Sequence, residues 1–226
     1  MHSKELLKHC AHLITQLLLF EQPADAVVAR YFREQRLLGP RERSVVAETA
    51  YNVLRHKLCF ERLAQQNGSP LPRALAMLGF AGAPDLLQAA LTPDEARWLA
   101  DSQQTLASAE SAEMRHNLPS WLEQVLRQEV DARFDALAAA LLQPAPLDVR
   151  VNTLLTKRNT VLDALQKAGI PAAATPYSPW GIRLQGKPTI TQTDLYRKGH
   201  IEVQDEGSQL LALLTDAKRN EMVVDF

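Results

Sequence analysis

With 226 residues, 46% of them hydrophobic, and a formal net charge of −1, the chain can form one or two domains around a sizeable core. No apolar run approaches the length of a membrane-spanning helix. Residues 1–20 mix Lys4, Glu5 and Lys8 and lack the cleavage site of a secretion signal, so we expect a cytoplasmic protein with no membrane partner.

Charge is unevenly distributed along the chain. Residues 27–73 carry nine basic and four acidic side chains, whereas residues 74–148 carry four basic and eleven acidic ones. A basic block can pair with phosphates, and an acidic block cannot. The signal is weak by itself, because charged helix faces are usually only solvated.

The first part of the chain predicts helices. Residues 4–19 have helical apolar spacing with Ser3 as a cap, and Pro23 marks a second helix that Gly39-Pro40 ends. A third helix is predicted over about 41–66, with two faces on a helical wheel. The apolar face holds Val46, Ala47, Ala50, Val53, Leu54 and Leu58, and the polar face holds Arg41, Glu48, Asn52, Arg55, Cys59 and Arg62. Asn67 to Pro70 then break the chain.

Residues 71–142 continue as short helices. Thr92-Pro93-Asp94-Glu95 predicts a helix start, with a threonine cap, a proline in the first turn and a glutamate three residues on. We interpret Trp121 as a packing anchor rather than a base-stacking platform. No period of 20–50 residues repeats, so a solenoid is not expected.

Gln143 to Pro146 predict a linker, and β patterns follow it. Residues 147–152 and 181–186 alternate like strands, and a helix is predicted between them at about 160–168. The last stretch, residues 200–226, predicts a strand, an acidic turn at Gly207, an apolar helix and a second strand over Met222–Phe226. Strand, helix and strand in this order are typical of the start of a parallel α/β layer.

Five segments carry a family resemblance. RERSVVAETAYNVLRHKL and RVNTLLTKRNTVLDALQKAGI with YSPWGIRL precede VQDEGSQL and VVDF in the chain. In this order they resemble the amino-terminal portion of the RsmB/Sun family of RNA (cytosine-5) methyltransferases. The resemblance implies an all-α NusB-like helical domain (1–142), a small α/β, RNA-recognition-like subdomain (143–199) and the truncated start of a Rossmann-like, S-adenosylmethionine-binding methyltransferase domain (200–226).

The resemblance also implies a partner, which is RNA and in particular rRNA. The candidate phosphate contacts in the helical domain are Arg41, Arg43, Arg55 and Arg62, and those in the α/β subdomain are Arg150, Lys157 and Arg158. Arginine suits this role because its planar fork meets two phosphate oxygens at once. Solvation of these side chains, or a structural role for Arg150, remains an alternative.

The sequence offers no complete catalytic site. Cytosine-5 methylation needs a thiolate and a bound methyl donor. Cys10 and Cys59 lie in helical stretches outside the family's thiol motifs, and the six histidines have no metal-ligand spacing. The resemblance implies that Asp225 lies where the first strand of the family's catalytic domain ends in an acid, but no glycine-rich loop follows it here. We therefore expect no catalytic, cofactor-binding or metal-binding residues, S-adenosylmethionine only in a longer parent protein, and no activity of this chain alone.

Two alternatives remain open. One is a non-enzymatic NusB-like module that binds RNA or a protein, which the basic helix over 41–66 favours. The other is self-association through an unfinished sheet with an open edge near Val223 and Val224. If the chain is instead the amino-terminal portion of a methyltransferase, we expect the natural chain to continue into a small, glycine-rich loop.

Overall fold

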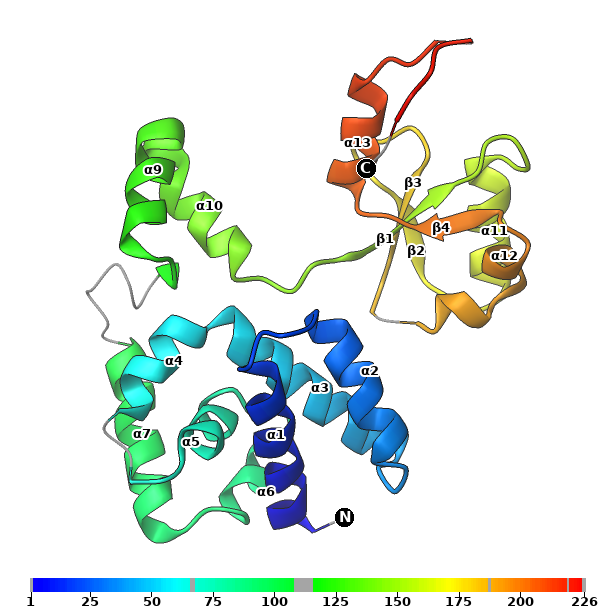
Figure 1. Cartoon of the computed structure of the whole chain (residues 1–226). Coiled ribbons are helices and arrows are strands. Elements are labelled where there is room, and N and C mark those ends of the chain that lie inside the picture. The colour runs from blue at the N-terminus through cyan, green and yellow to red at the C-terminus, as the bar shows by residue number, and fades with distance from the viewer. Residues whose placement is uncertain (1, 66–67, 108–115, 187, 219, 225–226) are drawn as a thin grey trace. The chain divides into compact units, whose positions relative to one another are not determined.

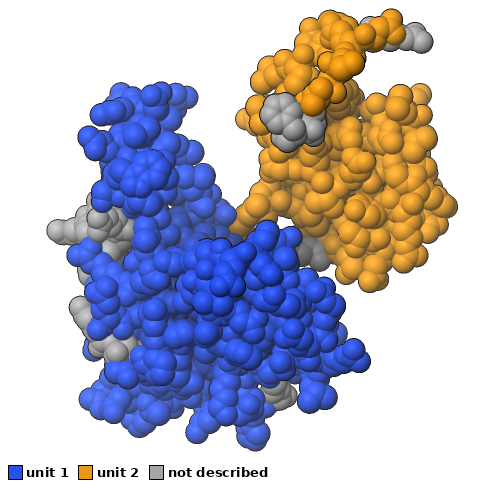
Figure 2. Space-filling view, in the orientation of Figure 1, with its two compact units in different colours: residues 1–143 blue, residues 144–226 orange. Residues whose placement is uncertain are grey.

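Figure 1 shows the computed structural model of the chain, which describes residues 2–65, 68–107, 116–186, 188–218 and 220–224. The chain forms two compact units, residues 1–143 and 144–226 (Figure 2). Each unit has its own cluster of buried apolar side chains. Of the helices described, none has both the length and the apolar character needed to cross a membrane.

The first unit is helical. In chain order its described elements are α1 (Ser3–Leu17), α2 (Ala24–Glu34), α3 (Pro40–Arg55), α4 (Lys57–Ala64), α5 (Leu71–Leu78), α6 (Pro84–Gln88), α7 (Pro93–Ala107), α9 (Ser120–Val130), the 3₁₀ turn η1 (Asp131–Arg133) and α10 (Phe134–Leu141).

Helix α1 organises the core of this unit, since it packs against α2, α3 and α5 (Figure 1). Its apolar residues recur at helical spacing, so Leu7, Leu13 and Ile14 are buried together with Leu75 of α5. The predicted first helix is confirmed. It begins at Ser3 itself, and the Ser3 side chain does not act as its cap.

The single helix predicted over 41–66 is wrong, because the chain forms two helices there. Helix α3 ends at Arg55, His56 has φ −111° and ψ 22°, and α4 begins at Lys57. The break shifts the phase of the helical wheel. Cys59, expected on the polar face, is 3% exposed, and Leu58, expected on the apolar face, is 38% exposed.

A distant side chain stabilises this break. Asn117 Nδ2 donates to the carbonyl oxygen of Arg55 at 2.5 Å, and Asn117 Oδ1 accepts from the N–H of Cys59 at 3.0 Å. These bonds satisfy backbone groups that an interrupted helix leaves without intrahelical partners. Asn117 has φ 51°, a left-handed conformation that asparagine adopts more readily than most residues.

The predicted start of α7 is confirmed as a reciprocal cap. The N–H of Glu95 donates to Thr92 Oγ1 at 3.3 Å, and the N–H of Thr92 donates to Glu95 Oε2 at 2.9 Å. Arg73 of α5 adds two hydrogen bonds to the Glu95 carboxylate, at 2.6 and 2.9 Å. The hydrogen bonds to Arg73 and Thr92 lower the pKa of Glu95, and burial raises it. The hydrogen bonds have the larger effect, so the pKa is about 2.

Trp121 of α9 is not the packing anchor that we expected, because the Trp121 side chain is 67% exposed. Glu123 is the buried residue of this helix. The aromatic anchor beside α9 is Phe134 of α10, which is 1% exposed. His116 contacts the Phe134 ring edge-on at 4.9 Å between centroids, and the Arg127 guanidinium lies 4.0 Å from the centre of that ring.

The second unit is a four-stranded sheet with helices. Its described elements are β1 (Leu147–Val151), α11 (Arg158–Lys167), β2 (Ala172–Ala174), β3 (Gly181–Leu184), the turn η2 (Ile190–Gln192), α12 (Asp194–Arg197), β4 (Ile201–Val203) and α13 (Glu206–Leu214). The strand order is β2-β3-β1-β4, and each neighbouring pair is antiparallel. The two strands and the helix predicted between 147 and 186 are confirmed, whereas the all-alanine strand β2 had not been foreseen.

The last stretch does not form the expected parallel layer. Strand β4 pairs antiparallel with β1, with Ile201 opposite Val151, and so belongs to the same sheet as the preceding strands. Residues 221–224 form no strand. Asp225 and Phe226, where an acidic strand end was expected, lie outside the described residues. The start of a Rossmann-like layer is therefore not confirmed.

Candidate nucleic-acid interface

The corner between α2 and α3 holds a concave basic site of about 380 Å³, which we call the arginine pocket. Its lining residues are Ala29, Phe32, Arg33, Arg36 and Arg43. The first three lie on α2 at spacings of three and four residues, so they share one face of that helix. The α2–α3 loop adds Arg36, and the first turn of α3 brings Arg43 to the same place.

Arg43 is fixed within the arginine pocket. Its Nε donates to the carbonyl oxygen of Leu38 at 2.8 Å, and its guanidinium lies 5.6 Å from the centre of the Phe32 ring. Leu38 is 3% exposed, so the acceptor belongs to the core. In the part of the chain that the structure describes, no ion pair joins Arg33, Arg36 or Arg43 to a carboxylate.

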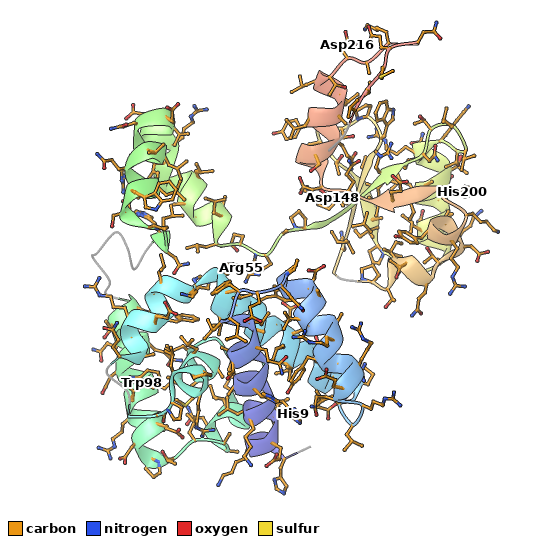
Figure 3. All side chains as sticks on the ribbon, viewed as in Figure 1. His9, Arg55, Trp98, Asp148, His200 and Asp216 are labelled. Atoms are coloured by element: carbon orange, nitrogen blue, oxygen red, sulfur yellow. The ribbon has the colours of Figure 1, made fainter. Side chains whose placement is uncertain are left out.

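The other candidates in the helical unit do not join this pocket. Arg41 is exposed beside it but does not line it. Arg55, labelled in Figure 3, ends α3, and its carbonyl oxygen accepts a hydrogen bond from Asn117. Arg62 lines a different depression of about 650 Å³, between α4 and the start of α9, together with Glu61 and Ser120.

Sequence reasoning missed Arg33 and Arg36. The candidates were sought on the predicted third helix, whereas four of the five lining residues come from the preceding helix and loop. The available signal was the run Arg30, Arg33 and Arg36 at spacings of three, which places cations along one side of a helix.

The three candidates of the second unit have different surroundings. Arg150 forms an ion pair with Glu202 on the neighbouring strand. Arg158 Nη1 donates to the carbonyl oxygen of Ser178 at 3.0 Å, so it supports the turn before β3. Lys157 is exposed at the start of α11.

The segment VQDEGSQL, residues 203–210, attaches α13 to the turn before β3. Glu206, at 5% exposed, accepts hydrogen bonds from the backbone N–H groups of Tyr177 at 2.7 Å and Ser178 at 2.8 Å. Burial alone would raise the pKa of the Glu206 carboxyl, but these donors and the charge of Arg183 outweigh it and hold that pKa below its ordinary value. Glu206 is therefore ionised and internal.

Gln209 completes this attachment, which we call the Glu206–Gln209 anchor. Gln209 is fully buried, accepts from Ser178 Oγ at 2.6 Å and donates to the carbonyl oxygen of Gln204 at 2.9 Å. Asp148 of β1, labelled in Figure 3, has a buried carboxylate that accepts two hydrogen bonds of 2.8 Å from Arg183. The Glu206 and Gln209 side chains are thus used inside the unit.

Neither cysteine is suited to nucleophilic chemistry. Cys10 and Cys59 are both buried and free. Burial raises the pKa of the Cys10 thiol to about 11 and also raises that of Cys59, which disfavours the thiolate. Among the residues described, no group of three or more histidine, cysteine or acidic side chains is placed to hold a metal ion.

The chain is thus a helical unit, which holds the arginine pocket, linked to a small antiparallel α/β unit. Over residues 118–191 the chain matches the family model described as Methyltr_RsmF/B-like, ferredoxin-like domain. That match begins at α9 and runs through β1, α11, β2 and β3.

The chain is also similar to named proteins. It is 32% identical over 107 residues to ribosomal RNA small subunit methyltransferase B of Pseudomonas syringae, covering 47% of this chain and 24% of that protein. It is 27% identical over 210 residues to the protein of the same name from Xylella fastidiosa, covering 82% of this chain and 49% of that protein. The crystal structure of PH0851 shares the fold, with a TM-score of 0.65 and 15% identity over 98% of this chain and 57% of that one.

These matches confirm the resemblance of the chain to the amino-terminal portion of the RsmB/Sun family. The chain spans about a quarter to a half of the length of these curated relatives.

Proposed function

We propose that this chain is the RNA-binding amino-terminal part of an S-adenosylmethionine-dependent rRNA (cytosine-5) methyltransferase. The observation that carries the proposal is the ferredoxin-like domain match over residues 118–191, together with relatives named as small-subunit rRNA methyltransferases. The arginine pocket supports it, because clustered cations without acidic partners attract a phosphate backbone.

The methyl donor does not fit the described residues of this chain. No glycine-rich loop follows a described strand, and the Glu206 and Gln209 side chains are already bonded to the turn before β3. When bound, S-adenosylmethionine supplies the methyl group. In this proposal, it is held by the part of the relatives that the chain does not cover, and the chain contributes RNA binding and orientation.

The first experiment measures RNA binding by the whole 226-residue chain. A fluorescein-labelled, single-stranded oligoribonucleotide from small-subunit rRNA is titrated by fluorescence anisotropy at several KCl concentrations. We expect the affinity to fall steeply as salt rises, because phosphate contacts release counterions. Absence of binding at low salt, or an affinity independent of salt, would contradict an RNA-binding role.

The reaction itself is tested on the natural gene product. Nucleoside mass spectrometry of small-subunit rRNA from cells with and without the gene should show one 5-methylcytidine that depends on it. An unchanged 5-methylcytidine content would contradict the methyltransferase assignment and leave the RNA-binding role standing.

A second candidate is a non-enzymatic NusB-like module, which the location of the arginine pocket wholly within the helical unit favours. It predicts RNA binding by the chain but no 5-methylcytidine that depends on the gene. The two experiments together therefore separate the candidates.

A further inference from the structure

We propose that the arginine pocket is a preorganised subsite for one phosphodiester group of a single RNA strand. This inference rests on the proposed function for its choice of RNA as the ligand. It goes further by assigning the contact to Arg33, Arg36 and Arg43, and by giving Phe32 the role of a support for Arg43.

The first step concerns Arg43. A solvated arginine samples many rotamers, and ordering it on binding costs entropy. Here Nε is bonded to the Leu38 carbonyl oxygen, and the guanidinium lies over the Phe32 ring. The conformational cost is therefore already met in the free protein, and no described residue takes the Nη groups as partners.

The second step concerns charge. Arg33 and Arg36 are exposed at the rim, and three guanidinium groups line a single site. Two carboxylates are close in the sequence. Glu34 is exposed and pairs with none of the three arginines in the described chain. The Glu42 carboxylate packs against Gly39, so closely that a Cβ added to this glycine would lie 2.6 Å from Glu42 Oε2. The uncompensated positive charge favours an anion.

The third step concerns the shape of the ligand. A guanidinium presents paired N–H donors in one plane, which match two oxygens of a phosphate. Phe32 is partly buried and its face is occupied by Arg43, so it supports a cation and does not offer a stacking surface to a base. The pocket therefore reads the backbone and not the sequence.

The test compares variants of the whole chain in the RNA titration described above. Arg43→Ala should weaken binding about tenfold and reduce the magnitude of the salt slope by about 0.7, the value of one phosphate contact on a single strand. Arg43→Lys keeps the charge but loses the planar fork, and Phe32→Leu keeps every charge but loses the support. Both should also weaken binding, which a diffuse basic surface does not predict.

Arg30→Ala is the matched control. It removes one positive charge from the same helix, but Arg30 is bonded to Gln22 and does not line the pocket. We expect little change. An equal loss with Arg30→Ala, or wild-type affinity for Arg43→Ala, Arg43→Lys and Phe32→Leu, overturns the pocket while leaving RNA binding itself intact. Circular dichroism melting of each variant checks that it is folded.

A direct measurement separates the pocket from the proposed function. Inorganic pyrophosphate is titrated into ¹⁵N-labelled chain, and the Arg43 Nε–H resonance is followed by NMR. We expect it to shift with saturation, and an unmoved resonance overturns the phosphate site. A shift with pyrophosphate but no RNA binding by the wild-type chain contradicts the proposed function alone. Displacement of RNA by polyglutamate but not by pyrophosphate overturns the proposal in favour of an acidic protein partner.

Discussion

At the scale of single residues, the helical unit depends on a few buried polar side chains whose partners lie far apart in the sequence. Glu95 is the clearest case. Its carboxylate is 8% exposed and accepts hydrogen bonds from Arg73, Ser69 and the backbone of Thr92. Because the Arg73 side chain is only 25% exposed, removing the acid leaves a partly buried cation without its partner.

We predict that Glu95→Gln lowers the free energy of unfolding by about 3 kcal/mol at pH 7, the usual cost of breaking a buried pair. The folded-state pKa of Glu95, about 2, lies below its unfolded value, so this stabilisation is complete above the unfolded pKa and is lost as pH falls toward 2. Urea unfolding at pH 7, 4 and 3 measures the difference from wild type, which should shrink with acidity. A constant difference would contradict the pKa.

Arg97→Gln is the control for this prediction. It breaks the exposed ion pair between Arg97 and Asp94 on the same helix. Exposed pairs contribute about 0–1 kcal/mol, so the free energy of unfolding should hardly change.

At the scale of elements, the break between α3 and α4 depends on Asn117, which has two separable properties. Its side chain bonds the backbone of Arg55 and Cys59, and its own backbone has a positive φ. A substitution that removes these hydrogen bonds can therefore either tolerate the positive φ of residue 117 or disfavour it.

Asn117→Ala should destabilise the chain by about 1–3 kcal/mol, since two backbone groups lose their partners and alanine disfavours φ 51°. Asn117→Gly should cost less than Asn117→Ala, because glycine adopts this φ freely. Urea unfolding of both variants measures the order. If both match wild type, the side chain does not stabilise the break.

The Glu206–Gln209 anchor acts at the same scale in the second unit, where it joins α13 to the turn before β3. We predict that Glu206→Gln increases hydrogen exchange at the amides of Tyr177 and Ser178 by about tenfold or more, because both donate to the carboxylate. NMR-detected exchange measures it. Glu202→Gln, which alters only an exposed pair with Arg150, should leave these two amides unchanged.

At the scale of the whole molecule, exposed apolar side chains gather on one helix. Leu211 and Leu214 of α13 are 67% and 78% exposed, and Val203 on the preceding strand is 49% exposed. We predict concentration-dependent self-association of the chain through this surface. Sedimentation velocity should show it, and Leu211→Gln with Leu214→Gln should abolish it. A monomer at all concentrations would contradict the prediction.

The sequence predicted local features of the molecule well and non-local ones poorly. Thr92 and Glu95 are three residues apart, so their cap could be read directly, and the two alternating strands needed only their own pattern. Cys59 was assigned to the wrong face because Asn117, 58 positions away, stabilises the break. The direction of β4 was missed because strand polarity is set by its partner, β1.

Only part of the arginine pocket was predicted, because its residues come from segments that meet only in the folded chain. Arg43 was identified from its helix, but the pocket also needs Phe32, Arg33 and Arg36, which another helix and a loop supply. The ion pair between Arg150 and Glu202 could not be predicted from the sequence, because the pairing of β1 with β4 creates that contact.

The pairing of β4 with β1 has a consequence for gene fusions. A chimaera that exchanges everything from His200 onward would take one edge strand from the sheet and replace the side chains that hold the turn before β3. A junction placed after Leu214 keeps both. Recombinants with the earlier junction should therefore accumulate in inclusion bodies, and those with the later junction should fold.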